Sequence, residues 1–150
     1  MKVKFSKKEI PKISQKLLER ILKMKNNKAK VVALSGELGA GKTTLTQEIA
    51  KQIGINENVI SPTYIIMKIY EINPSSKYYS SFKNLIHIDA YRLDSYLELL
   101  KIGWEELKKD KDNLIIIEWP ENVKNCLDKA TCWVKLGHVD DQTRAVEFLV

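Results

Sequence analysis

The chain has 150 residues, of which 44% are hydrophobic, and its 25 basic and 19 acidic residues give a net charge of +6. These values suggest one domain over residues 1–150, and no apolar run approaches the roughly 18 residues of a membrane-spanning helix. Lysines dominate the basic residues and are scattered, so we interpret the charge as solvated surface and do not predict autonomous binding to DNA or tRNA.

Two features predict the compartment. The N-terminal residues lack the apolar stretch of a signal peptide. Cys126 and Cys132 are the only cysteines, and they have neither CxxC spacing nor a nearby pair of histidines. We therefore expect free thiols in a protein of the reducing cytoplasm.

The first elements of the chain are a strand, a helix and a second strand. Lys2 to Phe5 is expected to form a short strand. Apolar residues recur at helical spacing over 11–24, and Pro11 suits a first turn, so this segment predicts an amphipathic helix. Asn26-Asn27-Lys28 interrupts it, and the apolar run Lys30–Ser35 predicts a buried strand.

A complete P-loop follows this strand. Gly36 to Thr43 matches the pattern G-x-x-x-x-G-K-[ST], and Thr44–Ile53 predicts the helix whose N-terminus faces the anion. The backbone N–H groups of such a loop surround a β-phosphate, Lys42 reaches the β and γ oxygens, and the Thr43 hydroxyl can hold Mg²⁺. The sequence therefore predicts a nucleotide-binding protein.

The remaining elements alternate between strands and helices. Val59–Glu71 predicts an extended segment interrupted at Ser61-Pro62, and Asn73 to Lys77 predicts a turn. The later expected elements, in order, are a strand Leu85–Asp89, a helix over 95–101 capped by Asp94 and ended at Gly103, a strand Leu114–Glu118, and strands 131–136 and 144–150 joined by a hairpin at Gly137–Asp141.

This order predicts an α/β fold of the P-loop NTPase type. We expect a mostly parallel sheet flanked by helices, with a C-terminal β-hairpin, because the most apolar strands are typical of a sheet covered on both faces. Ligand should bind beyond the carboxyl ends of the parallel strands.

Two strands end in a carboxylate that could serve the nucleotide site. A P-loop NTPase needs an acid near the P-loop to hold Mg²⁺ or to polarise the attacking water. Asp89 and Glu118 both qualify. The strand before Glu118 is the more apolar, which favours Glu118, and Asp89 stays open as an alternative.

Four motifs together resemble one family. Gly36 to Thr44, Ser61-Pro62-Thr63-Tyr64, His87-Ile88-Asp89-Ala90-Tyr91-Arg92 and Glu118-Trp119-Pro120-Glu121 are similar to the motif series of TsaE (formerly YjeE). This family comprises bacterial P-loop ATPases needed to make N6-threonylcarbamoyladenosine in tRNA. The motifs occur in the family's order over residues 36–121. The segment 73–84 is longer than expected for the family.

The resemblance implies a role for each motif. Thr43 and Glu118 would bind Mg²⁺, Asp89 would lie near the γ-phosphate as an orienting or catalytic acid, and Ser61-Pro62-Thr63 would act as a switch-like loop. Glu121 would approach the base or ribose. The residues expected to bind the phosphates of ATP or ADP are Gly39, Ala40, Gly41, Lys42, Thr43 and Thr44, and those expected to act in catalysis are Lys42, Asp89 and Glu118.

The resemblance also implies partners. Such a protein would bind ATP, hydrolyse it slowly and act on the TsaB–TsaD complex. It would meet tRNA only through that complex and would not bind a membrane. We predict that the surface on the γ-phosphate side, rather than the hairpin near Gly137, docks the partner. A small P-loop metabolite kinase is the main alternative, and a nucleotide switch without significant turnover is a third.

The roles of three further residues in these motifs are not decided by the sequence. His87 lies within a strand, which favours a core histidine over a catalytic base. Trp119 follows a buried strand and suits a core or cleft wall, or a partner contact. Arg92 is one of three arginines, and its guanidinium suits a carboxylate, a phosphate or a surface ion pair.

Overall fold

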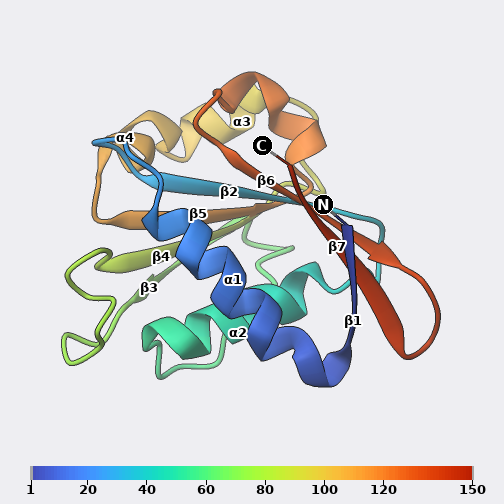
Figure 1. Cartoon of the computed structure of the whole chain (residues 1–150). Helices are drawn as coiled ribbons and strands as arrows, with labels where there is room; N and C mark the ends of the chain where they lie inside the picture. Colours follow the sequence, from blue (N-terminus) through green and yellow to red (C-terminus); the bar gives the residue numbers. More distant parts are fainter. Residues whose placement is uncertain (1, 150) are drawn as a thin grey trace.

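A computed structural model describes residues 2–149 of the chain. One sheet of seven strands, ordered β1-β7-β6-β2-β5-β4-β3, forms its centre (Figure 1). The strands are β1 (Lys2–Ser6), β2 (Lys30–Ser35), β3 (Met67–Glu71), β4 (Asn84–Asp89), β5 (Asn113–Glu118), β6 (Cys132–His138) and β7 (Thr143–Leu149). The helices are α1 (Ile10–Leu22), α2 (Lys42–Ile53), α3 (Tyr96–Lys101) and α4 (Trp104–Lys109), with 3₁₀ segments η1 (Lys7–Glu9) and η2 (Pro120–Cys126).

The centre of the sheet is parallel and its edges are antiparallel. β6, β2, β5 and β4 pair in parallel, whereas β1 with β7, β7 with β6 and β3 with β4 pair antiparallel. Only β7 and β3 therefore run against the other strands of the sheet. The predicted fold class, with its closing hairpin β6–β7, is confirmed.

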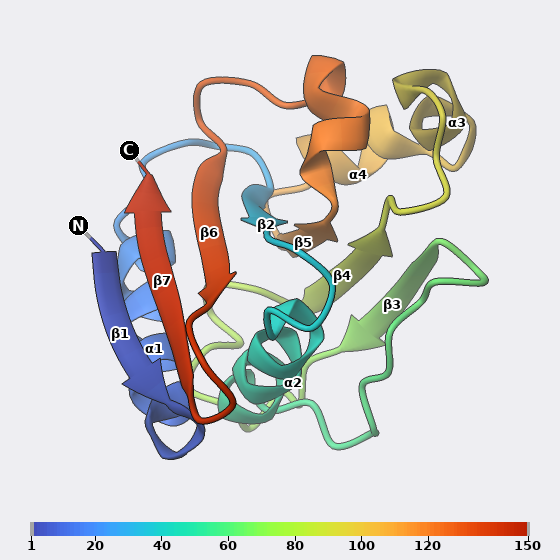
Figure 2. The ribbon, with the colours of Figure 1, turned by 90° about the vertical axis from the view of Figure 1, so that its right-hand side faces the viewer.

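Helices cover both faces of the sheet (Figures 1 and 2). α1 and α2 pack on one face, where Leu114 and Ile116 of β5 join the core. α3, α4 and η2 pack on the other, where Ile115 and Ile117 point. All six residues of β5 are buried, because neighbouring strands and helices enclose the strand on every side. No helix within residues 2–149 has the length and apolar character to cross a bilayer.

Three local expectations were wrong or incomplete. The segment 59–71 is a strand only from Met67, since Ile66 adopts a left-handed φ of 68° and its carbonyl accepts the N–H of Asp89. The α3 cap is Ser95, whose hydroxyl accepts from the N–H of Leu97, rather than Asp94. The helices α4 and η2 were not predicted.

The segment after β3 packs against the end of α2. The hydroxyl of Ser76 donates to the carbonyl of Ile53, 2.7 Å away, and the N–H of Asn73 donates to the carbonyl of Gly54. Gly54 has a φ of 96°, and a Cβ there would lie 2.8 Å from the Cβ of Ser76. This loop therefore fixes the C-terminus of the P-loop helix.

Candidate nucleotide-binding site

The P-loop connects the carboxyl end of β2 to the N-terminus of α2. Gly36 packs so closely on β6 that a Cβ would lie 2.6 Å from the carbonyl oxygen of Leu136. Gly41 precedes the first helical residue with a left-handed φ of 101°. Side chains at these two positions would displace β6 or strain the loop, so the glycines determine its shape.

Lys42 is the first residue of α2 and is only 6% exposed. Its ammonium lies 2.6 Å from the carbonyl oxygen of Gly36 and 3.0 Å from that of Glu37. It also lies 4.3 Å from the centroid of the Trp119 ring. The ammonium therefore lies inside the curve of its own loop, held by dipoles and an aromatic face.

The charges around Lys42 are negative. Burial lowers the pKa of Lys42, and the carboxylates of Glu118, Asp89 and Glu121 oppose that effect. A cationic amine surrounded by carboxylates at a helix N-terminus provides the charge pattern that an anionic ligand together with a divalent cation would complement.

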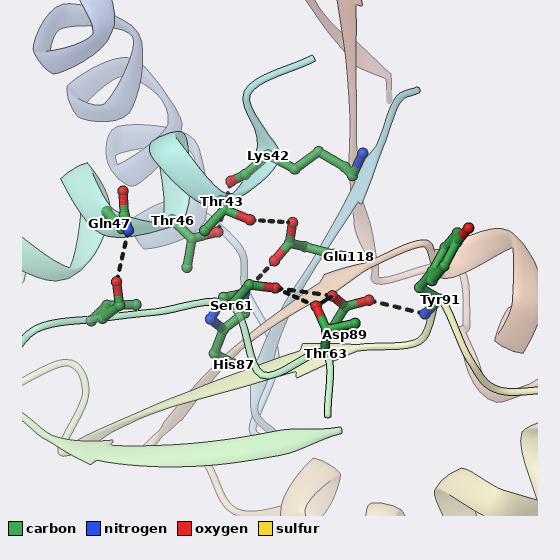
Figure 3. Close-up of polar contacts among 11 residues, drawn as sticks. Lys42, Thr43, Thr46, Gln47, Ser61, Thr63, His87, Asp89, Tyr91 and Glu118 are labelled. Atoms are coloured by element: carbon green, nitrogen blue, oxygen red, sulfur yellow. Dashed lines mark hydrogen bonds and ion pairs between the residues drawn. The ribbon is translucent and has the colours of Figure 1, made fainter. Parts of the chain in front are cut away.

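Glu118 ends β5 directly below the start of α2 (Figure 3). The Thr43 hydroxyl donates to its Oε1 at 2.9 Å, and His87 Nε2 lies 2.6 Å from its Oε2. Glu118 is 2% exposed and His87 is fully buried. The carboxylate that the sequence favoured therefore contacts the P-loop hydroxyl.

Asp89 ends the neighbouring strand and is the register partner of Glu118. Its Oδ2 accepts from the hydroxyls of Ser61 at 3.0 Å and Thr63 at 2.8 Å, and its Oδ1 accepts from the N–H of Tyr91 at 3.0 Å (Figure 3). Asp89 thus anchors the loop before β3, whereas Glu118 contacts the P-loop.

The donor set around Thr43 and Glu118 fits Mg²⁺. Mg²⁺ is bound through one or two carboxylates, hydroxyl oxygens, waters and the phosphates of its ligand. Within residues 2–149 there is no cluster of three or more histidine, cysteine, aspartate or glutamate side chains arranged to hold a metal. A cation here would therefore be held jointly by Thr43, Glu118 and a bound phosphate.

An apolar cavity of about 340 Å³ adjoins the second half of the P-loop. Its walls come from Phe5, Lys7, Ile10, Leu45 and Arg144 together with Gly39, Ala40, Gly41 and Thr44. Gly39 to Thr44 are the residues expected to bind phosphates, and the cavity beside them is large enough for a nucleoside. The sequence did not single out Phe5, Ile10 or Arg144 for the site, since β1, α1 and β7 are brought together only by the fold.

Glu121 lies apart from the cavity at Thr44, and its approach to the base or ribose stays a prediction. Its carboxylate accepts a hydrogen bond from the hydroxyl of Ser35, before the P-loop. It lines a separate cavity of about 380 Å³ with Ser35, Trp119 and His138, rather than the cavity at Thr44. The Trp119 backbone has a left-handed φ of 58°, which directs η2 and Glu121 to this side.

Trp119, Tyr91 and Arg92 lie around the same end of the sheet. The rings of Trp119 and Tyr91 have centroids 5.0 Å apart, so Trp119 forms a cleft wall beside Lys42. The Arg92 guanidinium lies 4.4 Å from the ring centroid of Tyr64. Arg92 therefore stacks on the loop that Asp89 anchors, and it forms no ion pair within residues 2–149.

Comparisons with known proteins identify a family. The family model described as threonylcarbamoyl adenosine biosynthesis protein TsaE matches residues 6–146. The tRNA threonylcarbamoyladenosine biosynthesis protein TsaE of Haemophilus influenzae is 36% identical over 135 residues, which cover 90% of this chain and 79% of that protein. The protein of the same name from Rickettsia prowazekii is 39% identical over 115 residues, covering 76% of this chain and 73% of its own length.

A solved structure has a similar fold. The crystal structure of Bacillus subtilis YdiB matches with a TM-score of 0.67 at 22% sequence identity, covering 99% of this chain and 84% of that one. The family match over most of the chain and the identity to the curated relatives lead to one conclusion: this chain belongs to the TsaE family.

Proposed function

We propose that this protein binds ATP, hydrolyses it slowly and serves the synthesis of threonylcarbamoyladenosine in tRNA by acting on the TsaB–TsaD complex. Family membership and the names of the relatives support the pathway. The observation that carries the ATPase assignment is the contact of the Thr43 hydroxyl with Glu118 at the start of the P-loop helix.

Each part of the site has a proposed task. The backbone N–H groups of Gly39 to Thr44 bind the phosphates, and the Lys42 ammonium exchanges its loop carbonyls for β and γ oxygens. Thr43 and Glu118 hold Mg²⁺, which when bound neutralises charge on the β and γ oxygens. The cavity between Phe5 and Arg144 receives the nucleoside.

Asp89 is proposed as the acid that orients the attacking water. Its oxygens accept from the hydroxyls of Ser61 and Thr63 and from the backbone N–H of Tyr91. A carboxylate occupied by three donors is poorly placed to accept a proton from water. This arrangement supports slow turnover by the isolated protein, with acceleration when a partner moves the loop.

The same loop is the proposed docking surface for TsaB–TsaD. Large side chains project into solvent beside it, including Tyr64 at 82% exposure and Ile65 at 63%. Tyr91 is also exposed, and Arg92 stacks on Tyr64. An apolar patch attached to Asp89 couples the nucleotide site to a partner's surface.

Hydrolysis assays test this proposal. The protein alone should release phosphate slowly from ATP, and addition of the TsaB–TsaD complex should raise the rate. Tyr64→Ser should abolish the stimulation and keep the basal rate, whereas Val139→Ser, at the exposed tip of the β6–β7 hairpin, should retain both. A rate that does not respond to TsaB–TsaD would contradict the proposed partner.

A metabolite kinase usually needs an arginine that stabilises the phosphate being transferred. Each of the three arginines of this chain contacts another part of the protein instead. Arg20 lies over the ring of Phe148, Arg92 over that of Tyr64, and Arg144 donates to the carbonyls of Asp140 and Thr143. A metabolite that this protein phosphorylates faster than it hydrolyses ATP would nevertheless replace the ATPase assignment.

A further inference from the structure

His87 has two ring nitrogens in very different surroundings. The side chain is fully buried at the level of Ile116 on β5. Its Nε2 lies 2.6 Å from Glu118 Oε2, whereas its Nδ1 has no hydrogen-bond partner among residues 2–149. Most buried side-chain polar atoms have a hydrogen-bond partner, so a ring with one paired and one unpaired nitrogen needs an explanation. Here the one polar contact of the ring is directed at the carboxylate below the P-loop (Figure 3).

The short contact fixes the position of one proton. Two bare lone pairs cannot lie 2.6 Å apart without repulsion, so a proton lies between Nε2 and Oε2. An imidazole with its hydrogen on Nε2 supplies that proton, and the unpartnered Nδ1 then carries a lone pair. His87 is then a hydrogen-bond donor to a charged acceptor, which is the stronger kind of bond.

The two carboxylate oxygens of Glu118 have different partners. Oε2 is occupied by His87 and Oε1 faces the hydroxyl of Thr43. The carboxylate is buried, so an Oε2 without a donor would carry the cost of an unsatisfied charged atom. Rotation of the carboxylate to find another donor would turn Oε1 away from Thr43.

We propose that His87 is a positioning residue, whose Nε2–H holds Glu118 in the orientation that presents Oε1 to the metal and the P-loop. The proposal rests on the proposed function, because it assigns His87 to the Mg²⁺ ligand Glu118. It goes beyond the core role that the sequence favoured. Partners that orient metal ligands typically change metal affinity by 10- to 100-fold when they are removed.

Two variants with amide side chains distinguish the loss of the hydrogen bond to Glu118 from a change in polarity or packing. His87→Gln carries an amide nitrogen that can reach the place of Nε2, whereas the shorter His87→Asn places its amide near Nδ1. His87→Leu removes the donor and keeps an apolar filling. The control is His138→Gln, because His138 is the other histidine of the chain and is exposed on β6.

The measurement is calorimetric titration of ADP at a series of Mg²⁺ concentrations, with the unfolding free energy of each variant measured in parallel. The Mg²⁺ midpoint is the Mg²⁺ concentration at which the effect of the cation on ADP affinity is half complete. His87→Leu and His87→Asn should raise this midpoint by about 10- to 100-fold. Both should keep the affinity for ADP without Mg²⁺ within about twofold of the original protein, since the phosphate-binding amides are unchanged. His87→Gln and His138→Gln should stay close to the original midpoint.

Each outcome separates the two claims. If Glu118→Gln shifts the Mg²⁺ midpoint while His87→Asn and His87→Leu do not, the role of His87 is overturned and the role of Glu118 stands. If Glu118→Gln leaves the midpoint unchanged, both claims are overturned. If His87→Asn and His87→Gln lose the same amount of unfolding free energy and the same affinity for ADP without Mg²⁺, His87 has a purely structural role. If His87→Leu does not fold, the comparison of Asn with Gln decides.

Discussion

The ammonium of Lys42 lies 4.3 Å from the centroid of the Trp119 ring, and so connects the P-loop to the residue that follows Glu118. A ligand that draws Lys42 to its β and γ oxygens must weaken this contact. ATP or ADP binding should therefore change the fluorescence of Trp119. The change should be lost in Trp119→Phe and kept when the buried Trp104 or the β6 residue Trp133 is replaced by Phe. A nucleotide signal that persists in Trp119→Phe would contradict the coupling.

Replacing Lys42 tests the P-loop directly. Lys42→Ala removes the cation that meets the phosphates and leaves the backbone amides in place. We expect ATP affinity to fall about tenfold or more, which corresponds to about 1.4 kcal/mol. Calorimetry measures the loss, and Lys51→Ala, an exposed lysine later on α2, is the matched control. Unchanged affinity in a folded Lys42→Ala protein would exclude the P-loop as the binding site.

The two strand-end acids have distinct predicted effects. Glu118 contacts Thr43 and Asp89 contacts the loop hydroxyls, so their removal should affect different steps. Glu118→Ala should reduce Mg²⁺-dependent hydrolysis strongly, with a smaller effect on Mg²⁺-free nucleotide binding. Asp89→Ala should reduce hydrolysis and leave the Mg²⁺ midpoint near its original value. The reverse pattern, measured side by side, would make Asp89 the metal acid.

Thr63 tests whether the loop senses the γ-phosphate. Its hydroxyl donates to Asp89 at 2.8 Å, and Thr63→Val removes that hydrogen bond with little change in shape. We expect affinity for a non-hydrolysable ATP analogue to fall by about 0.5–1.5 kcal/mol, roughly two- to tenfold, and affinity for ADP to stay the same. The control is Ser75→Ala in the loop after β3. Equal losses for both nucleotides would show that the loop does not distinguish them.

Both cysteines should be unreactive in the folded protein. Burial raises the pKa of the Cys126 and Cys132 thiols, so less thiolate exists at neutral pH than in the unfolded chain. Alkylation by iodoacetamide, followed by mass spectrometry, should be about tenfold slower or more than in urea. Rapid modification of either thiol under native conditions would contradict the packing around it.

The central part of the fold was predictable because the patterns that determine it lie within short stretches of the sequence. The P-loop pattern lies between an apolar strand and a helix in the sequence itself, and the apolar runs of β4 and β5 each end in a carboxylate. Parallel strands bring their carboxyl ends to one edge, so Asp89 and Glu118 were expected near the P-loop. The two residues are register partners at the ends of β4 and β5.

What the sequence did not predict depends on contacts between distant segments. The helix α4 has six residues and too few turns for a periodic pattern, and Trp104 anchors it in the core. The cavity between Phe5 and Arg144 forms only because β1 pairs with β7. The bond from His87 to Glu118 joins residues 31 positions apart, and no pattern in either motif distinguishes it from core packing.

The measurement that tests the account most directly is the threonylcarbamoyladenosine content of tRNA after depletion of this protein in its own cell. Mass spectrometry of digested tRNA should show a fall in this nucleoside in tRNAs that read codons beginning with A. The original gene should restore it, and a Lys42→Ala version should not. Normal modification after complete depletion would contradict the proposed function, even if the nucleotide site proved correct.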